Sequence, residues 1–339
     1  MSSRRQQSSP TPQFPEPQFP ERTGPPTMSD TAVQTPGETP GSAPVTVRSR
    51  SGVPSSSDAA WRKAKRQRRL EWIAVHSIAI TVALVFILPF VFLFLTSVMT
   101  DSQALTTNFW PQHWVWSNYR TVFNVPGFGT WWKNTIEYAV LGTALTVLSS
   151  VPVAYALAKF RFPGRRLAML LVISMMMLPP QVIIIPMYLF WAKQMHLDGT
   201  LWPLIIPMAF GDAYSIFLLR QFLLTIPKEY LDAAKVDGCG EVRTLLKVVL
   251  PMARPAISAV ALFQFFSCWN DYFGPQIYAS DNPSAWTLSY GLQSFHGAHQ
   301  TNWNMTMAAT LLVMAPVIVV FFFAQKAFIE GVTLTGVKG

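Results

Sequence analysis

The few residues of this chain that could carry chemistry lie in apolar sequence. Asp212 and Asp271 interrupt two apolar stretches, and Trp269 and Asn270 directly precede Asp271. A charged side chain inside a membrane is costly and usually marks a functional site. Carboxylate, amide and indole groups together can hydrogen-bond to and stack on a neutral polyol. The same groups could instead form hydrogen bonds between helices, so both interpretations stay open.

Motifs for nucleotide hydrolysis, acyl transfer and metal-dependent proteolysis are missing from the sequence, which has no GxxxxGK[ST], GxSxG or HExxH pattern. The pair His296 and His299 has no neighbouring carboxylate or thiol to complete a set of three or four ligands. Cys239 and Cys268 occur in unrelated contexts. We therefore expect no catalytic residue, no metal and no cofactor bound by this chain.

A second candidate site is the polar loop at residues 226–251. Residues 230–236 favour a helix, because Pro227 precedes them and Glu229 complements the helix N-terminus. The small side chains of Ala233 and Ala234 allow another protein to approach closely.

The second half of this loop contains glycines at turn positions. Gly238 and Gly240 permit a turn with positive φ, and residues 241–249 predict a second helix that Pro251 ends. Such a helix–glycine–helix elbow is suited to docking another protein. An amphipathic interfacial helix would explain the basic residues of the loop but not its Gly and Pro spacing.

The spacing of this loop resembles the EAA loop of ABC importer permeases, whose pattern is E-A-A-x3-G-x9-I-x-L-P. The matching residues are Asp232, Ala233, Ala234, Gly238, Val248, Leu250 and Pro251. Asp232 stands for Glu and Val248 for Ile, and every spacing is kept. Four further stretches resemble the carbohydrate branch, and most closely the shorter permease of maltose-type importers: 154–164, 217–222, 269–271 and 330–339. The resemblance runs from about residue 73 to the end of the chain.

This resemblance implies a permease subunit of an ATP-driven, binding-protein-dependent carbohydrate importer, in which closure of an ATPase is coupled to alternating access. The positions implied to couple to the ATPase are Glu229, Asp232, Ala233, Ala234, Asp237, Gly238, Leu250 and Pro251. A C-terminal ATPase contact is implied at Gly331, Gly336, Lys338 and Gly339. The implied partners are a second homologous permease, two ATPase subunits that bind ATP and Mg, an extracytoplasmic sugar-binding protein and the carbohydrate itself.

The elements that must position these residues are predicted to be membrane helices. Half of the 339 residues are hydrophobic and only 13% are charged, which excludes an ordinary soluble enzyme. Six apolar stretches each approach the roughly 20 residues that a helix needs to span a membrane. They lie at 73–98, 134–158, 167–191, 201–222, 256–278 and 305–325. The pair Pro179 and Pro180 is expected to break or kink the third.

The distribution of basic residues predicts the orientation. Eighteen Lys and Arg fall on the side that holds the 226–251 loop, and three fall on the other. The positive-inside rule therefore predicts an all-α integral membrane protein with six transmembrane helices, both termini cytoplasmic, and a cytoplasmic coupling loop. The formal charge of +9 indicates membrane topology and lipid contact, with no nucleic acid as partner. We expect a multi-pass protein of a prokaryotic cell membrane.

The composition along the chain predicts a division into three segments. Residues 1–60 hold 11 of the 27 prolines and predict a disordered Pro/Ser-rich cytoplasmic tail. A basic juxtamembrane segment is predicted at 61–72, and the six-helix permease domain at 73–339.

Other functions compete with the carbohydrate permease. An ion-coupled secondary transporter would use Asp212 and Asp271 as ion sites, but it predicts inverted repeats that are not visible and leaves the 226–251 loop unexplained. A membrane-embedded enzyme would need a catalytic constellation. An ABC permease for another small neutral solute also fits. A neutral solute is favoured over an anion, because an anion would lack a charge partner in the channel and an unpaired charge there is costly.

Overall fold

The computed structural model describes residues 56–104, 106–295 and 302–336, and every regular element in these residues is a helix. The all-α class is therefore confirmed. Most of the predicted tail and the pair His296 and His299 lie outside the described residues. The chain divides into two units, Met1–Arg69 and Leu70–Gly339, and the packing discussed below lies within the second.

The helices have the following bounds in chain order: α1 Ser56–Ser97, α2 Asp101–Ala104, α3 Ser117–Phe123, α4 Phe128–Lys159, α5 Arg165–Met177, α6 Pro180–Tyr188, η1 Leu189–Gln194, α7 Trp202–Ile205, η2 Ile206–Phe210, α8 Ala213–Thr225, α9 Lys228–Val236, α10 Glu241–Thr244, η3 Leu245–Val249, α11 Leu250–Met252, α12 Arg254–Trp269, α13 Phe273–Ala279, η4 Pro283–Ala285, α14 Leu288–Gly291, η5 Leu292–Phe295 and α15 Trp303–Gly336. Among them, η1 and η3 are π-helical.

Four helical segments are long and apolar enough to cross a membrane: Lys63–Ser97, Phe128–Lys159, Trp202–Thr225 and Trp303–Gln325. They contain or closely match the first, second, fourth and sixth predicted stretches. The count reaches six only if each of two bent helix pairs forms one span. The predicted number of six spans and the predicted orientation of the termini therefore stay predictions.

The third predicted stretch, 167–191, is not one helix. Its two halves, Arg165–Met177 and Pro180–Gln194, are bent by 93°. Leu178 and Pro179 both adopt extended backbone, because each precedes a proline, which disfavours the α conformation of the residue before it. The predicted break at Pro179 and Pro180 is therefore confirmed.

The fifth predicted stretch, 256–278, is wrong at its C-terminal end. Helix α12 stops at Trp269, and α13 begins separately at Phe273. The carboxylate of Asp271 accepts a hydrogen bond from the Gly274 amide at 2.9 Å, which satisfies an amide in the first turn of α13. A polar side chain that bonds to nearby backbone thus competes with continuation of the helix.

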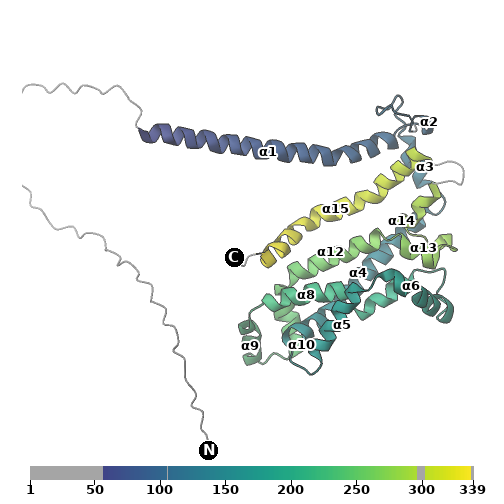
Figure 1. Cartoon of the computed structure of the whole chain (residues 1–339). Helices are drawn as coiled ribbons and strands as arrows, with labels where there is room; N and C mark the ends of the chain where they lie inside the picture. Colours follow the sequence, from purple (N-terminus) through teal and green to yellow (C-terminus); the bar gives the residue numbers. More distant parts are fainter. Residues whose placement is uncertain (1–55, 105, 296–301, 337–339) are drawn as a thin grey trace, which may run out of the picture. The chain divides into compact units, whose positions relative to one another are not determined.

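The centre of the described fold is α4, which packs against α8 and α12 (Figure 1). Two hydrophobic clusters lie at different levels along α4: one includes Val151 and Leu157, and the other includes Trp131 and Ala139. A helix of 32 residues is about 48 Å long. The two clusters therefore fix opposite ends of one long helix.

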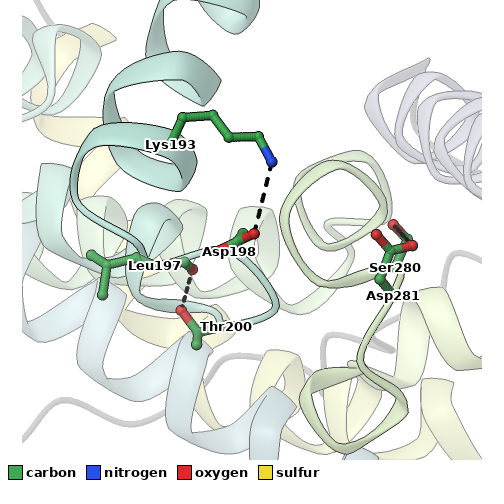
Figure 2. A network of polar contacts seen from close by, with 6 residues as sticks. All are labelled: Lys193, Leu197, Asp198, Thr200, Ser280 and Asp281. Carbon is green, nitrogen blue, oxygen red and sulfur yellow. Dashed lines mark hydrogen bonds and ion pairs between the residues drawn. The ribbon is translucent and has the colours of Figure 1, made fainter.

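The end near Trp131 is closed by polar contacts between loops. Asn134 donates to the carbonyls of Ser284 and Trp286 at 2.8 and 2.9 Å, and Asn282 donates to the Gly199 carbonyl at 2.8 Å. Figure 2 shows that Lys193 reaches Asp198 at 3.9 Å in the neighbouring loop. Both of these side chains are more than half exposed, so this ion pair adds little stability. The Asn282 contact joins the two loops, and the Asn134 contacts join one of them to α4.

Candidate functional site

The 226–251 loop contains a short amphipathic helix, as predicted. Helix α9 follows Pro227 and carries Glu229 in its first turn. Leu231 and Ala234 are buried, whereas Asp232 and Ala233 on the other side are exposed. Spacing of three residues places Leu231 and Ala234 on one face of a helix. The helix is therefore anchored by one face and presents the other.

A Schellman motif ends α9. The Cys239 amide donates to the Ala234 carbonyl at 2.9 Å, and the Gly238 amide donates to the Lys235 carbonyl at 3.0 Å. This pair of bonds requires a left-handed residue just beyond the helix end, and Gly238 has φ of +75°. The prediction of positive φ at Gly238 is confirmed. A Cβ atom added there would meet no atom within 4 Å, so only backbone conformation restricts this position.

Gly240 differs from the prediction of a positive φ. Its φ is −70° and its ψ is 163°, which is extended backbone that any residue can adopt. Its carbonyl accepts the Thr244 amide at 2.9 Å. The turn therefore needs one left-handed residue, at Gly238, and Gly240 begins the second helix.

Pro251 does not end the second helix, contrary to the prediction. The helical path runs through α10, the π-helical turn η3 and α11, and it ends at Met252. Pro251 has no amide hydrogen to donate and would clash with the carbonyl four residues earlier in a regular α-helix. The π-helical turn η3 ends at Val249, just before Leu250 and Pro251, and its hydrogen bonds join residues five apart instead of four. The 79° bend comes at Ala253, just before Pro255.

Glu241 ties this loop to α4. Its carboxylate accepts a hydrogen bond from the Tyr155 hydroxyl at 3.2 Å and lies 3.2 Å from the Lys235 amine. Tyr155 is only 3% exposed. One carboxylate thus joins α4, α9 and α10, and the buried hydroxyl makes the bond to α4 directional.

A second contact fixes the entry to the loop. The Lys159 amine at the end of α4 donates to the Ile226 carbonyl at 2.7 Å. Beside it, a cavity of about 180 Å³ is bordered by both basic and acidic side chains, among them Lys228, Asp232 and Glu241. The loop is therefore held in place while its outer face stays accessible.

Most of the implied coupling residues lie where another protein could reach them. Glu229, Asp232, Ala233, Asp237 and Pro251 are exposed. Ala234 is 5% exposed and packs inward, and Leu250 is half-buried against the same hydrophobic cluster as Leu231. Ala234 and Leu250 therefore support the elbow rather than present a surface.

The implied C-terminal contact is described only in part. Gly331 and Gly336 lie in the last turns of α15. Lys338 and Gly339 lie outside the described residues.

The candidate substrate residues do not form one site. Trp269 is 2% exposed, and its indole Nε1 donates to the Val313 carbonyl at 3.2 Å. Its ring stacks on Phe265 with centroids 5.5 Å apart. Trp269 therefore belongs to the core, and the prediction that it offers a ring face to a sugar is not supported by this packing.

Asn270 and Asp271 are more exposed than Trp269. Asn270 is exposed, and its amide donates to the Phe266 carbonyl at 2.9 Å. Asp271 is half-buried, and it accepts the Tyr138 hydroxyl at 2.9 Å besides the Gly274 amide. Asn270 is thus accessible, whereas Asp271 joins α4 to α13.

Asp212 is not in the middle of a helix, contrary to the prediction. It caps α8, where its carboxylate accepts the Ser215 amide at 2.7 Å. The preceding Gly211 has φ of +94° and ψ of 147°, a conformation that is almost confined to glycine. The chain therefore breaks here within the fourth stretch.

Asp212 and Asp271 lie at different levels of α4. The Asp212 amide donates to the Ser150 hydroxyl at 3.2 Å, whereas Asp271 accepts from Tyr138. Twelve helical residues separate Ser150 from Tyr138, which corresponds to about 18 Å along the axis. The two carboxylates are therefore not brought together into one ion site.

Sequence reasoning did not find the contacts of Glu241, Tyr155 and Lys159. Tyr155 and Lys159 are in the 154–164 stretch that already resembled a known family, and Glu241 follows Gly240 directly. The signal for a shared role was absent, because Tyr155 and Glu241 are 86 residues apart in the chain.

Comparison with known proteins gives consistent matches. A family model described as "Binding-protein-dependent transport system inner membrane component" matches residues 150–333. The arabinooligosaccharides transport system permease protein AraQ of Halalkalibacterium halodurans is 30% identical over 282 residues, covering 82% of this chain and all of that protein. The osmoprotective compounds uptake permease protein GgtD of Synechocystis is 30% identical over 277 residues, covering 78% of this chain and 92% of that protein.

A solved structure also matches. One chain of a bacterial ABC transporter involved in the import of the acidic polysaccharide alginate is 26% identical, with a TM-score of 0.66. The match covers 78% of this chain and 98% of that chain.

Proposed function

Because this chain belongs to the family of binding-protein-dependent transport system inner membrane components, we propose that it is the permease subunit of an ATP-driven carbohydrate importer and that its 226–251 loop couples ATP hydrolysis to alternating access. No group of His, Cys, Asp and Glu that could hold a metal ion lies in the described residues. The proposed role of the loop is mechanical: it transmits force between a separate ATPase and the membrane helices.

The observation that carries this proposal is the anchored elbow at α9. Leu231 packs into the hydrophobic cluster at the end of α4, and the Schellman turn at Gly238 fixes the direction of the next helix. Glu241 then joins both helices to Tyr155 of α4. A push on the exposed face of α9 would thus reach α4 through both apolar packing and a directional hydrogen bond. A mobile loop could not transmit such a displacement.

The partners follow from the family. We expect two ATPase subunits that bind ATP and Mg, a second homologous permease and an extracytoplasmic binding protein. The C-terminal segment at Gly331–Gly339 is proposed as a second ATPase contact. On the predicted orientation, α9 and the end of α4 face the cytoplasm, where ATP is available.

A carbohydrate is the proposed substrate class. AraQ by its name transports arabinooligosaccharides, and the matched solved transporter imports alginate. GgtD by its name takes up osmoprotective compounds, so relatives of similar identity differ in what they carry. Exposed Asn270 is the remaining candidate for contact with sugar hydroxyls.

Purification of the full-length chain from its native membranes tests the proposal. The tagged chain should copurify with an ATPase, a second permease and ATP hydrolysis activity that an added binding-protein fraction stimulates. Sugar released from that binding protein on denaturation would identify the substrate. If the chain purifies without an ATPase under conditions that preserve other membrane complexes, the proposal is wrong.

A further inference from the structure

A cavity of about 450 Å³ lies between the start of α5 and α8, and no residue of the 226–251 loop lines it. It is lined by Arg165, Arg166, Met169, Leu170, Ile173 and Arg220. No acidic side chain is among these lining residues. Three guanidinium groups therefore border one cavity without a carboxylate to balance their charge.

Two of these arginines are held in position by the end of α4. The Arg220 Nε donates to the Leu157 carbonyl at 3.2 Å, and the Arg165 guanidinium donates to the carbonyls of Ala158 and Phe160 at 3.4 and 3.1 Å. These carbonyls lie in and just beyond the last helical turn of α4, where main-chain acceptors lack partners within the helix. A guanidinium has five N–H donors, so each arginine keeps further donors for a ligand.

Arg166 is exposed, and the described residues provide it with no hydrogen bond or ion pair. Met169, Leu170 and Ile173 follow it by three, four and seven positions on α5. Residues at this spacing lie on one face of a helix, and seven residues rise about 10 Å. An apolar strip therefore leads away from the charged mouth of the cavity along the helix.

We infer that this cavity binds an anionic phospholipid, with its phosphodiester at the three arginines and an acyl chain along Met169, Leu170 and Ile173. Arginine binds phosphate oxygens through pairs of N–H donors. The apolar strip distinguishes a lipid from a soluble anion, because Leu170 and Ile173 are 58% and 38% exposed and gain by contact with a hydrocarbon chain.

The position of the cavity agrees with a lipid of the cytoplasmic leaflet. Arg220 contacts the same end of α4 as Lys159, which binds the entry of the 226–251 loop. On the predicted orientation this end is cytoplasmic, and basic pockets between membrane helices on that side bind anionic headgroups. An acidic protein surface would pair with the arginines but would not explain the apolar strip beside them.

The test uses the full-length chain with its copurifying subunits, delipidated in detergent and then titrated with phosphatidylglycerol or phosphatidylcholine. Bound lipids are counted by native mass spectrometry. Arg166→Gln is the informative variant, because Arg166 supports no described contact of the fold. Arg161→Gln is the matched control, because it removes the same charge from an exposed residue shortly before α5 that does not line the cavity. Arg166→Lys tests whether charge alone suffices.

We expect preferential retention of phosphatidylglycerol. Arg166→Gln should lower the affinity for this lipid roughly fivefold, which is the contribution of one basic residue near a membrane surface. Arg161→Gln should bind as the unchanged chain does, and Arg166→Lys should recover part of the loss. Equal behaviour of Arg166→Gln and Arg161→Gln would overturn the inference. Displacement of the lipid by millimolar inorganic phosphate would identify a soluble anion instead. A photocrosslinker at Leu170 that captured the ATPase would identify a protein contact instead.

Discussion

At the scale of single residues, Trp269, Asn270 and Asp271 are adjacent in sequence but have different surroundings. Trp269 is buried and hydrogen-bonded to α15, Asn270 is exposed, and Asp271 joins α4 to α13. Their residue types suggested a sugar site, yet residue types cannot show which side chains a helix end turns inward. The three side chains have different surroundings because α12 ends at Trp269, whereas the sequence predicted that this helix continues.

Substitution of these neighbours separates a core role from a substrate role. Trp269→Ala should lower the free energy of unfolding by roughly 3–5 kcal/mol, because it removes a large buried ring. Asn270→Ala should change it by only about 0.5 kcal/mol, as exposed sites usually do, while sugar uptake falls. Thermal unfolding of the purified complex and uptake in vesicles measure the two effects. Wild-type uptake by Asn270→Ala would remove this residue from the substrate pathway.

Tyr155 and Glu241 give a second prediction at the residue scale. Tyr155→Phe keeps the ring packing and deletes only the hydroxyl that donates to Glu241. A hydrogen bond of this kind contributes about 1 kcal/mol or more, so the amount of sugar moved per ATP should fall severalfold while the ATPase still copurifies. Glu241→Ala combined with Tyr155→Phe should be no worse than Glu241→Ala alone, because Glu241→Ala already removes the acceptor of this hydrogen bond.

A hydroxyl elsewhere on the chain serves as the control for that pair. Tyr119→Phe removes a contact with Ser97 at 2.7 Å, remote from the loop, and should leave the coupling ratio unchanged. Strictly additive losses from Tyr155→Phe and Glu241→Ala would contradict a shared role.

At the scale of elements, the helix–glycine–helix elbow could be predicted because its signals are local. Pro227, the alanines of α9 and Gly238 lie within a dozen residues, and each has its own backbone preference. The break at Gly211 was missed because the fourth predicted stretch is apolar on both sides of it. Hydropathy measures how apolar a segment is, but it does not show that a glycine adopts positive φ and interrupts the helix.

Gly238 and Gly240 provide a matched pair for testing the elbow. A Cβ atom added at either glycine would meet no atom within 4 Å, but only Gly238 has positive φ. Gly238→Val should cost roughly 1–3 kcal/mol in local strain and reduce ATPase association, whereas Gly240→Val should retain it. Copurification of the ATPase with each variant at equal membrane abundance measures this. Equal retention in both variants would contradict the docking role of the Schellman turn.

At the scale of the whole molecule, composition and charge distribution predicted an all-helical membrane protein, and the described helices agree with that class. The number of spans depends on whether each bent helix pair crosses the membrane once. Long-range contacts such as Tyr155 with Glu241 connect distant segments, and nothing in local sequence encodes them. They nevertheless determine how a displacement at α9 would reach the long helix α4.

The separation of Asp212 from Asp271 matters most for the mode of energy coupling. The two carboxylates lie at different levels of α4, and each is engaged with a nearby backbone amide. This arrangement gives a secondary transporter no paired ion site, whereas the α9 elbow gives an ATPase a fixed contact. We therefore expect ATP, rather than an ion gradient, to supply the driving force.

The most direct test is uptake of the sugar recovered from the copurified binding protein by proteoliposomes that contain the purified complex. ATP is enclosed in the vesicles or omitted, and ionophores collapse ion gradients in a parallel set. Uptake should require both ATP and the binding protein, and it should be unaffected by the ionophores. Uptake driven by an imposed ion gradient without ATP would contradict an ATP-driven permease.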